Sequence, residues 1–324
     1  MDRPEFPLIY GDQGIPPQHR QASGDGGIVS AIVPVRGVSK VEENESIRTM
    51  TTDLNQLAEL LRAVAREEIM PRWRRAVATS KTDGSLVTET DLAVQQRIVA
   101  ALAEVSPDIP VLGEEMEVDA QKALLAPNDG QSAFWCLDPL DGTSNYACGF
   151  PAFAISLALV RGGQAELGLI LDPVHDECFM ATRGEGAWRD GEPLRPFAPG
   201  NELTDCLAVV DMKRLPPRRI APLFATGSFR SQRNLGAVAL EWCWLAAGRF
   251  QLYLHGGQRL WDHAAGRLIA TEAGAASILC TPDGSQPADA LDLEPRVAVA
   301  AANPELLRRW LALIDLPLRA SKAA

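Results

Sequence analysis

The stretch WCLDPLDGTSNYACGFPAFAISLAL, residues 135–159, consists of two apolar runs joined by a polar segment, DPLDGTSN (138–145). Within that segment two aspartates stand three positions apart, and a glycine and two hydroxyl residues follow. Asp-Gly is common in turns between strands. Paired carboxylates at the end of a buried strand can also hold a divalent cation. The segment alone fits both interpretations, so the rest of the chain has to decide between a turn and a metal site.

The aspartate pair has the residue types that a metal site needs. Pro139 fixes φ and keeps the segment extended or in a turn. Asp138 and Asp141 can therefore be directed at one point. The carbonyl of Leu140 then remains free as a further oxygen ligand.

The residues that follow favour a phosphate group beside the metal. Gly142 permits a close approach of the backbone. Thr143 and Ser144 are predicted to open a short helix, whose free N–H groups can receive a phosphate oxygen. The segment thus offers metal ligands, an anion pocket and a hydroxyl.

Further carboxylates stand at the ends of apolar strands or at the starts of helices, where they can point into a common cleft. They are Asp91, Glu114, Glu115 and Asp262. Gathering them without cations would be costly, because like charges raise each other's pKa. Each acid also has a simpler explanation. Asp91 or Asp262 could cap a helix. The two glutamates could form a solvated turn, and Asp141 with its glycine could form a hairpin.

The chain is expected to contain a poorly ordered extension followed by two lobes. Residues 1–50 are rich in Gly, Pro and charge and lack a sustained period, so they are interpreted as disordered or as an overlong start. Residues 51–200 are expected to form an α+β lobe that carries most metal ligands. Residues 201–318 are expected to form an α/β lobe that completes the active site and the substrate pocket.

Two helices are predicted before the main strand region. The first begins at Asp53 and is disturbed or ended by Pro71. Its apolar face is expected to contain Leu54, Leu57, Leu61 and Val64. The segment KTDGS (81–85) is predicted to form the turn of a hairpin. The second helix follows Asp91 and is expected to bury Leu92, Ile98, Val99 and Leu102.

Strand signals dominate the middle of the chain. The predicted strands are 109–113, 133–138, 153–160, 166–173, 177–182 and 186–194. The last five are expected to form an antiparallel meander. After residue 200, strands alternate with helices, which is an α/β pattern. These strands are expected at 206–210, 251–255, 276–280 and 297–301, and the helices at 236–248, 262–274 and 304–315.

The composition is that of a soluble, acidic protein. The net charge is −11 and no dense Lys/Arg run is present, so neither nucleic acid nor an anionic membrane is an expected partner. No apolar run reaches the roughly 18 residues of a membrane span. Because no CxxC pair occurs, we interpret the six cysteines as reduced core residues of a cytoplasmic protein. They stand at positions 136, 148, 178, 206, 243 and 280.

Four acidic segments occur in a specific order. They are DGSLVTETD (83–91), VLGEE (111–115), the opening stretch, and WDHAAGRLIATEAGA (261–275). Together they resemble the segments of the inositol monophosphatase family of Mg²⁺-dependent phosphatases, and the resemblance runs from about residue 53 to 315. It implies a layered αβαβα sandwich of the inositol monophosphatase and fructose-1,6-bisphosphatase type, usually a homodimer. It also implies a lithium-sensitive phosphoric monoester hydrolase that uses two or three Mg²⁺ ions.

The resemblance implies a role for each acid. Glu114, Asp138 and the Leu140 carbonyl would hold one Mg²⁺. Asp138, Asp141 and Asp262 would hold a second. Two metals can clamp the in-line displacement at phosphorus, so no protein nucleophile is needed.

It also implies how water and phosphate are held. Asp91 and Thr143 would polarise the attacking water, with Glu114 as a further catalytic residue. The backbone amides of Gly142 and Thr143 would bind phosphate, and Glu115 would lie close to the metal ligands. A mobile loop that helps to close the site and to place a third ion would contain Lys81 and Asp83.

The substrate pocket departs from the inositol-phosphate enzymes. His255 stands where those enzymes have a Glu that contacts ring hydroxyls, and a histidine cannot copy its two acceptors. Ala237 and Val238 stand where a hydroxyl residue and a small residue are common. His255 is either a neutral surface residue or part of a pocket for another monoester, or for a substrate with a second anionic group. The candidate substrate contacts are Ser144, Ala237, His255 and Asp262.

We expect Mg²⁺-dependent hydrolysis of an inositol-1-phosphate-like or other sugar or polyol phosphate. DGTSNY (141–146) is closer to the inositol and fructose-bisphosphate enzymes than to the 3′(2′),5′-bisphosphate nucleotidases. The segment around residues 81–91 is instead common in nucleotidases and histidinol phosphatases. Hydrolysis of histidinol phosphate or of a bisphosphate nucleotide is therefore an alternative. A further alternative is a non-catalytic regulatory binding protein on the same fold.

Overall fold

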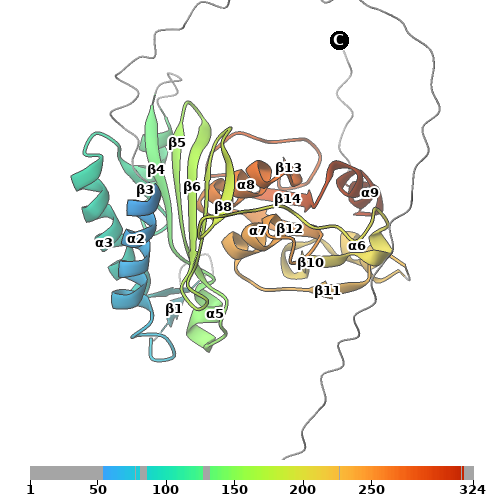
Figure 1. The fold of residues 1–324 in the computed structure, drawn as a ribbon, viewed down its shortest axis with the longest axis horizontal. Coiled ribbons are helices and arrows are strands. Elements are labelled where there is room, and N and C mark those ends of the chain that lie inside the picture. Colours follow the sequence, from blue (N-terminus) through green and yellow to red (C-terminus); the bar gives the residue numbers. More distant parts are fainter. Residues whose placement is uncertain are drawn as a thin grey trace, which may run out of the picture. The chain divides into compact units, whose positions relative to one another are not determined.

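The computed structural model describes residues 54–76, 78–80, 86–126, 132–225, 227–314 and 316. These residues lie in one compact unit, which begins after Met50 (Figure 1). The predicted N-terminal extension, the cap at Asp53 and the loop residues Lys81 and Asp83 lie outside the described residues.

The first sheet has seven strands in the order β3-β4-β5-β6-β7-β8-β9. Their bounds are β3 Val111–Gly113, β4 Ala133–Asp141, β5 Ala154–Arg161, β6 Gln164–Asp172, β7 Glu177–Thr182, β8 Gly186–Arg189 and β9 Glu192–Pro193. β3 is parallel to β4, and each later neighbour is antiparallel to the one before it. The predicted antiparallel meander is confirmed.

The second sheet has five strands in the order β11-β10-β12-β14-β13. Their bounds are β10 Leu207–Asp211, β11 Ser231–Arg233, β12 Leu252–Gln258, β13 Ala276–Cys280 and β14 Arg296–Ala301. β10 is parallel to both of its neighbours, whereas β14 is antiparallel to β12 and β13. The alternation of strands and helices predicted after residue 200 is therefore present.

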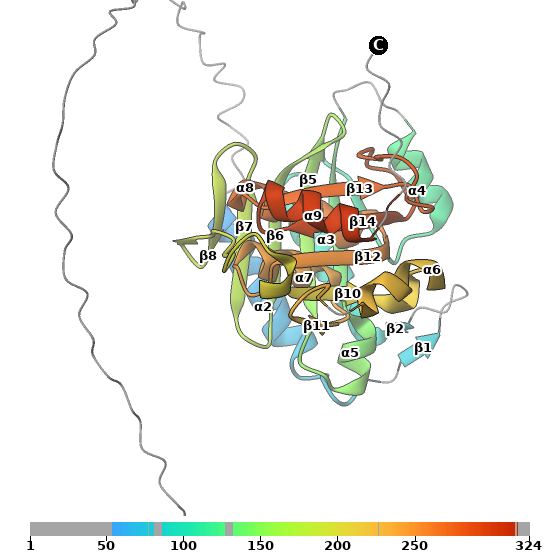
Figure 2. The ribbon, with the colours of Figure 1, turned by 90° about the vertical axis from the view of Figure 1, so that its right-hand side faces the viewer.

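Three layers of helices cover the two sheets (Figure 1). The outer layer contains α2 Leu54–Val64, which continues as one π-helical turn to Ile69, and α3 Glu89–Val105. The middle layer contains α7 Val238–Ala246 and α8 Leu260–Ala273. α9 Pro304–Ile314 lies across the second sheet (Figure 2). The predicted αβαβα sandwich is confirmed.

The alternation of side chains along the strands explains the layers. On β4, Trp135 and Leu137 pack with α2 and α3, while Phe134 and Cys136 pack with α7 and α8. Successive strand residues point to opposite faces, so an apolar residue at every position buries both faces of the sheet. Whether residues 51–200 and 201–318 form separate lobes stays a prediction.

Shorter elements complete the structure. They are the antiparallel hairpin of β1 Ala78–Ser80 and β2 Leu86–Thr88, the helices α4 Val118–Leu125, α5 Thr143–Cys148 and α6 Pro217–Ile220, and the 3₁₀ segments η2 Leu203–Asp205, η3 Met212–Arg214 and η4 Ala221–Phe224. The hairpin predicted around KTDGS is confirmed by its strands, although the turn itself is outside the described residues. No helix among the described residues is long and apolar enough to span a membrane.

Two predictions of burial are wrong. In α3, Leu92 is 47% exposed and Val99 is 38% exposed, whereas Ile98 and Leu102 are buried as predicted. The buried face runs through Val94, Ile98 and Leu102, four residues apart, and residues 92 and 99 lie together on another face. The six cysteines are free, but Cys148 is exposed at the end of α5 and is not a core residue.

Candidate active site

The structure brings most of the predicted site residues to one cavity of about 490 Å³. Its wall is formed by β4, α5, the start of α8 and loops of the second sheet. The predicted residues that line it are Glu114, Asp138, Leu140, Asp141, Gly142, Thr143, Ser144, His255 and Asp262. Asp91, Glu115 and Ala237 are not among the lining residues. Ala237 is fully buried, while its neighbours Gly236 and Val238 line the cavity.

A β-bulge places Asp138 and Asp141 on the same side of the sheet. Residues three apart on a regular strand point to opposite faces. Here Asp138 pairs with Ser156 and Asp141 with Ala154, so β4 has one more residue than β5 across this interval. The extra residue restores the common face. Pro139 lies inside the bulge, where no ladder N–H is required.

Asp141 also caps a helix of the middle layer. Its Oδ2 accepts from the backbone N–H of Ala239 at 2.8 Å, and its Oδ1 from that of Val238 at 3.2 Å. These N–H groups begin α7, where the N-cap residue Ala237 supplies no side-chain bond. A carboxylate at a helix N-terminus satisfies orphan donors and is favoured by the helix dipole. The first sheet and α7 are thus joined at the wall of this cavity.

Gly142 and Thr143 form the turn into α5, as predicted. Gly142 has φ +84°, and a Cβ there would lie 2.9 Å from the Ala152 carbonyl oxygen, so only glycine fits. The Thr143 hydroxyl lies within donating distance of the Leu140 carbonyl, at 3.0 Å, and of Asp91 Oδ1, at 3.2 Å. Asp91 therefore reaches the cavity through Thr143.

The capping explanations offered for Asp91 and Asp262 also hold. Asp91 is buried and its Oδ2 accepts from Thr88 N at 2.8 Å, which completes a capping box at the start of α3. Asp262 accepts from Arg259 N at 2.8 Å at the start of α8. Each of these carboxylates keeps its other oxygen outside the cap, so capping leaves room for a second contact.

The backbone of Glu114 is held in position from α4. Its N–H donates to the Leu137 carbonyl at 3.1 Å. Gln121 is the buried residue of α4, and its Nε2 donates to the carbonyls of Gly113, at 2.8 Å, and Glu114, at 3.3 Å. Glu114 and Glu115 lie in a turn, but both are half-buried and not fully solvated, and Glu114 lines the cavity.

The acids at the cavity are costly to ionise together. Burial, followed by the charges of Glu114, Asp141 and Asp262, raises the pKa of Asp138 well above its ordinary value. Burial and the charge of Asp262 do the same to the pKa of Asp141. Burial and Glu114 raise the pKa of Asp262 to about 6. A cation in this place would relieve the repulsion and favour the ionised forms.

A model of the inositol monophosphatase family matches residues 49–315 of the sequence. The chain belongs to the inositol monophosphatase family. It is 33% identical to inositol monophosphatase 1 of Solanum lycopersicum over 240 residues, which cover 71% of this chain and 83% of that protein. It is also 34% identical to Nus factor SuhB of Pseudomonas aeruginosa over 204 residues, or 58% of this chain and 70% of that protein.

A solved structure of an IMPase from Thermotoga maritima has a TM-score of 0.65 and 27% identity, with 81% of this chain and 98% of that chain covered. Membership of the inositol monophosphatase family supports a phosphatase activity, and the family is Mg²⁺-dependent. The donor set agrees with this family property, because Mg²⁺ prefers oxygen ligands and the cavity offers carboxylates and the Leu140 carbonyl. Within the described ranges, no three His, Cys, Asp or Glu side chains lie close enough to hold an ion as they stand.

His255, which lines the cavity, belongs to a pair that could not be predicted from the sequence. His255 is only 2% exposed, so its interpretation as a surface residue is wrong. Its Nε2 lies 3.1 Å from Asp211 Oδ2, and its Nδ1 accepts from Gly257 N at 3.3 Å. Burial opposes ionisation of Asp211, but the bond with His255 and the charges of His255 and Arg214 hold the pKa of Asp211 well below its ordinary value.

Basic side chains line the same cavity and were also missed. They are Lys213, Arg214 and Arg259. Arg214 forms an ion pair with Asp211. Among the residues that the structure describes, Lys213 and Arg259 have no carboxylate partner. The available signals were a Lys-Arg pair that begins three positions after the predicted strand 206–210, and an Arg inside the stretch LHGGQRLWD (254–262).

A buried acid behind the cavity was the third omission. Glu241 accepts from the backbone N–H groups of Leu235 and Gly236, both at 3.2 Å, and from the Tyr253 hydroxyl at 2.8 Å. Gln258 donates to that hydroxyl at 2.8 Å. Because Gly236 lines the cavity, Glu241 positions its wall. The sequence of α7 did not indicate a role for Glu241, because all the remaining residues of this helix are apolar and show no polar face.

Proposed function

We propose that this protein hydrolyses a small sugar or polyol phosphate monoester that carries a second negatively charged group. The products would be the alcohol and inorganic phosphate: the water oxygen forms a bond to phosphorus, the ester P–O bond breaks, and the leaving oxygen takes up a proton. The observation that supports this proposal is a single cavity lined both by the acids of β4 and α8 and by three cationic side chains, Lys213 and Arg214 after β10 and Arg259 before α8.

The acids would serve the transferred phosphate. Glu114, Asp138, Asp141, Asp262 and the Leu140 carbonyl would hold Mg²⁺. Bound Mg²⁺ supplies charge neutralisation at the phosphate and activates water. The remaining contribution of the chain is mainly positioning and electrostatic stabilisation.

Asp91 and Thr143 would orient the water. When the Thr143 hydroxyl donates to Asp91, its oxygen lone pairs remain available to accept from a water in the cavity. Burial, and to a smaller extent Glu114, raise the pKa of Asp91, which makes its carboxylate a better proton acceptor.

The cationic side chains would bind the part of the substrate that carries the second negative charge. Lys213 and Arg259 are cations without a carboxylate partner in the described chain, and a second phosphate or a carboxylate would satisfy both. The amine of histidinol phosphate would instead be repelled. His255, held by Asp211, replaces a carboxylate that would repel a second anion.

The test is a phosphate-release panel in Mg²⁺ with inositol 1-phosphate, fructose 1,6-bisphosphate, histidinol phosphate and adenosine 3′,5′-bisphosphate. We expect the highest kcat/KM with fructose 1,6-bisphosphate and the lowest with histidinol phosphate. A preference for inositol 1-phosphate or histidinol phosphate would contradict the second-anion assignment. No release from any substrate would contradict the enzymatic assignment.

A role through protein contacts is a second candidate, because one relative is named Nus factor SuhB. The two roles separate in a strain from which the gene is deleted. If catalysis is the function, wild-type protein restores the phenotype and Asp141→Asn does not. Full restoration by Asp141→Asn would favour the contact role.

A further inference from the structure

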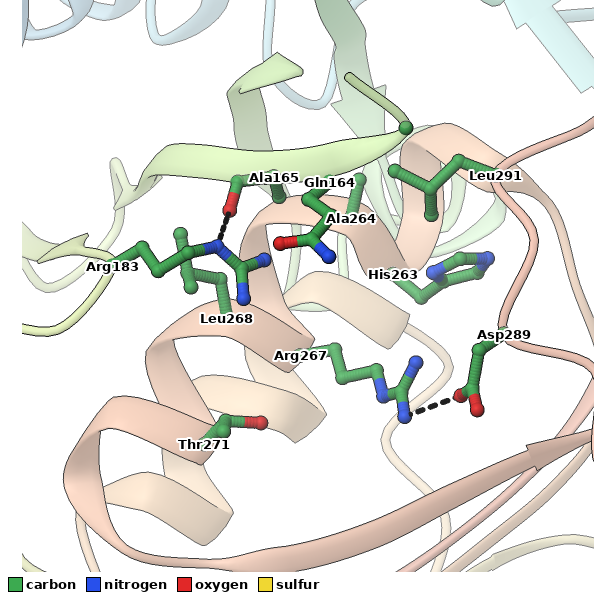
Figure 3. Close-up of a pocket in the computed structure, with 11 residues that line it drawn as sticks. Gln164, Ala165, Arg183, His263, Ala264, Arg267, Leu268, Thr271, Asp289 and Leu291 are labelled. Atoms are coloured by element: carbon green, nitrogen blue, oxygen red, sulfur yellow. Dashed lines mark hydrogen bonds and ion pairs between the residues drawn. The ribbon is translucent and has the colours of Figure 1, made fainter. Parts of the chain in front are cut away.

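A second cavity, of about 300 Å³, lies against α8 (Figure 3). It shares no lining residue with the active-site cavity. It lies between α8, the turn that joins β5 to β6, the end of β7 and the loop before β14. Its polar lining residues are Gln164, Arg183, His263, Arg267, Thr271 and Asp289. Successive residues of an α-helix are rotated by about 100° around its axis. Asp262 and His263 are adjacent on α8 and can therefore line different cavities.

Two arginines give this cavity an excess of positive charge. Arg183 donates through Nε to the Ala165 carbonyl at 2.8 Å, and it has no ion pair within the described part of the chain. Arg267 bonds to Asp289 at 2.7 Å from the other wall (Figure 3). The side chain of Asp289 is 66% exposed, so water screens the charge that it contributes. The arginines therefore leave one positive charge without a fixed partner.

His263 adds a polar atom that has no partner. Its side chain is 2% exposed, and its Nδ1 is buried without a hydrogen bond to any described residue. Buried polar atoms are nearly always satisfied, so an exception beside a cavity points to a ligand or a water. In Figure 3 the imidazole lies between Arg267 and Leu291, on the wall of the cavity.

We propose that this cavity binds a phosphate group of a small molecule. Guanidinium groups form strong, often bidentate bonds to such oxyanions. Donors on α8 and after β7 approach from different directions, which suits a tetrahedral group better than a planar carboxylate. The volume is at the lower end for a ligand site, which limits the ligand to a small molecule.

The test is isothermal titration of inorganic phosphate into the full chain in EDTA. Without metal, the acids of the active-site cavity repel phosphate, and a repeat titration of the Lys213→Gln/Arg259→Gln variant excludes binding to the cations of that cavity. The measurement therefore does not depend on the proposed catalytic function. We expect saturable binding at one site per chain, unchanged in Asp141→Asn. Arg183→Gln and Arg267→Gln should each weaken binding at least tenfold, whereas Arg66→Gln, an exposed arginine that lines neither cavity, should not.

Asp289→Asn provides a test in the opposite direction. This change removes the carboxylate that competes with phosphate for Arg267, so phosphate should bind several-fold more tightly. Because the side chain of Asp289 is exposed, its replacement should have little effect on folding. The proposal is overturned if phosphate binds wild-type protein only weakly and without saturation, as an adventitious ion would. It is also overturned if phosphate binding is unchanged in both Arg183→Gln and Arg267→Gln, or if Asp289→Asn does not strengthen it. Circular dichroism of each variant verifies that the fold is kept.

Discussion

Asp141 on β4 accepts a 2.8 Å hydrogen bond from the backbone N–H of Ala239 at the start of α7. One side chain thus serves both the cavity and the packing of the middle helical layer against the first sheet. The bulge that contains Pro139 makes this possible, because it turns Asp141 to the same face as Asp138.

Asp141→Asn should separate these two roles. The amide oxygen can still accept from Ala239, and the lost charge no longer repels Asp262, so stability without metal should change by less than about 1 kcal/mol. The charge is lost, so Mg²⁺ should no longer raise Tm. In wild-type protein, Mg²⁺ at 100 times its Kd should add about 2.7 kcal/mol of stability. Thermal unfolding with and without Mg²⁺ measures this, with the exposed Asp205→Asn as control. An equal Mg²⁺ shift in Asp141→Asn would remove it from the ligand set.

Thr143→Val should lower kcat by roughly 100-fold with little change in KM, because the water loses its orienting hydroxyl while the side-chain shape is kept. Thr143→Ser restores the hydroxyl and should recover most of the rate. Steady-state kinetics with fructose 1,6-bisphosphate provide the measurement. Equal rates for the Val and Ser variants would show that the hydroxyl has no role in catalysis.

Lys213→Gln and Arg259→Gln should distinguish doubly anionic substrates from singly anionic ones. Each should raise KM for fructose 1,6-bisphosphate by about tenfold, which corresponds to ~1.4 kcal/mol. KM for inositol 1-phosphate should change much less. A uniform rise for both substrates would indicate that these cations serve the transferred phosphate instead.

Glu241→Gln should reduce the dependence of stability on pH. Burial raises the pKa of Glu241 despite its hydrogen bonds. The folded state therefore binds the proton more tightly than the unfolded state. This contribution is fully present below the unfolded pKa and is lost as pH rises through the folded pKa. Urea unfolding between pH 5 and 8 should show a flatter profile for the variant than for wild-type protein. Parallel profiles would mean that Glu241 does not titrate differently on folding.

Local patterns were sufficient to predict the strands and most of the acids. The meander follows from short apolar runs separated by Gly-rich turns, and DPLDGTSN (138–145) with its companion segments identifies one site. Helix faces were less certain. The helix α3 was predicted to begin after Asp91, but it begins at Glu89. Leu92 and Val99 were predicted to be buried in it, but both are exposed.

Long-range pairs could not be predicted from one sequence. His255 is buried because Asp211, on a neighbouring strand of the second sheet, provides a partner for it. Lys213 and Arg214 reach the cavity because β10 is parallel to β12, which no local period reveals. The bulge at Pro139 likewise depends on the register with β5.

The most direct test of the central claim is phosphate release from fructose 1,6-bisphosphate by wild-type protein and Asp141→Asn, in Mg²⁺, after EDTA, and after Mg²⁺ is restored. The account predicts release by wild-type protein only when Mg²⁺ is present, recovery when it is restored, and none by Asp141→Asn at any stage. Release that persists in EDTA, or normal turnover by Asp141→Asn, would contradict it.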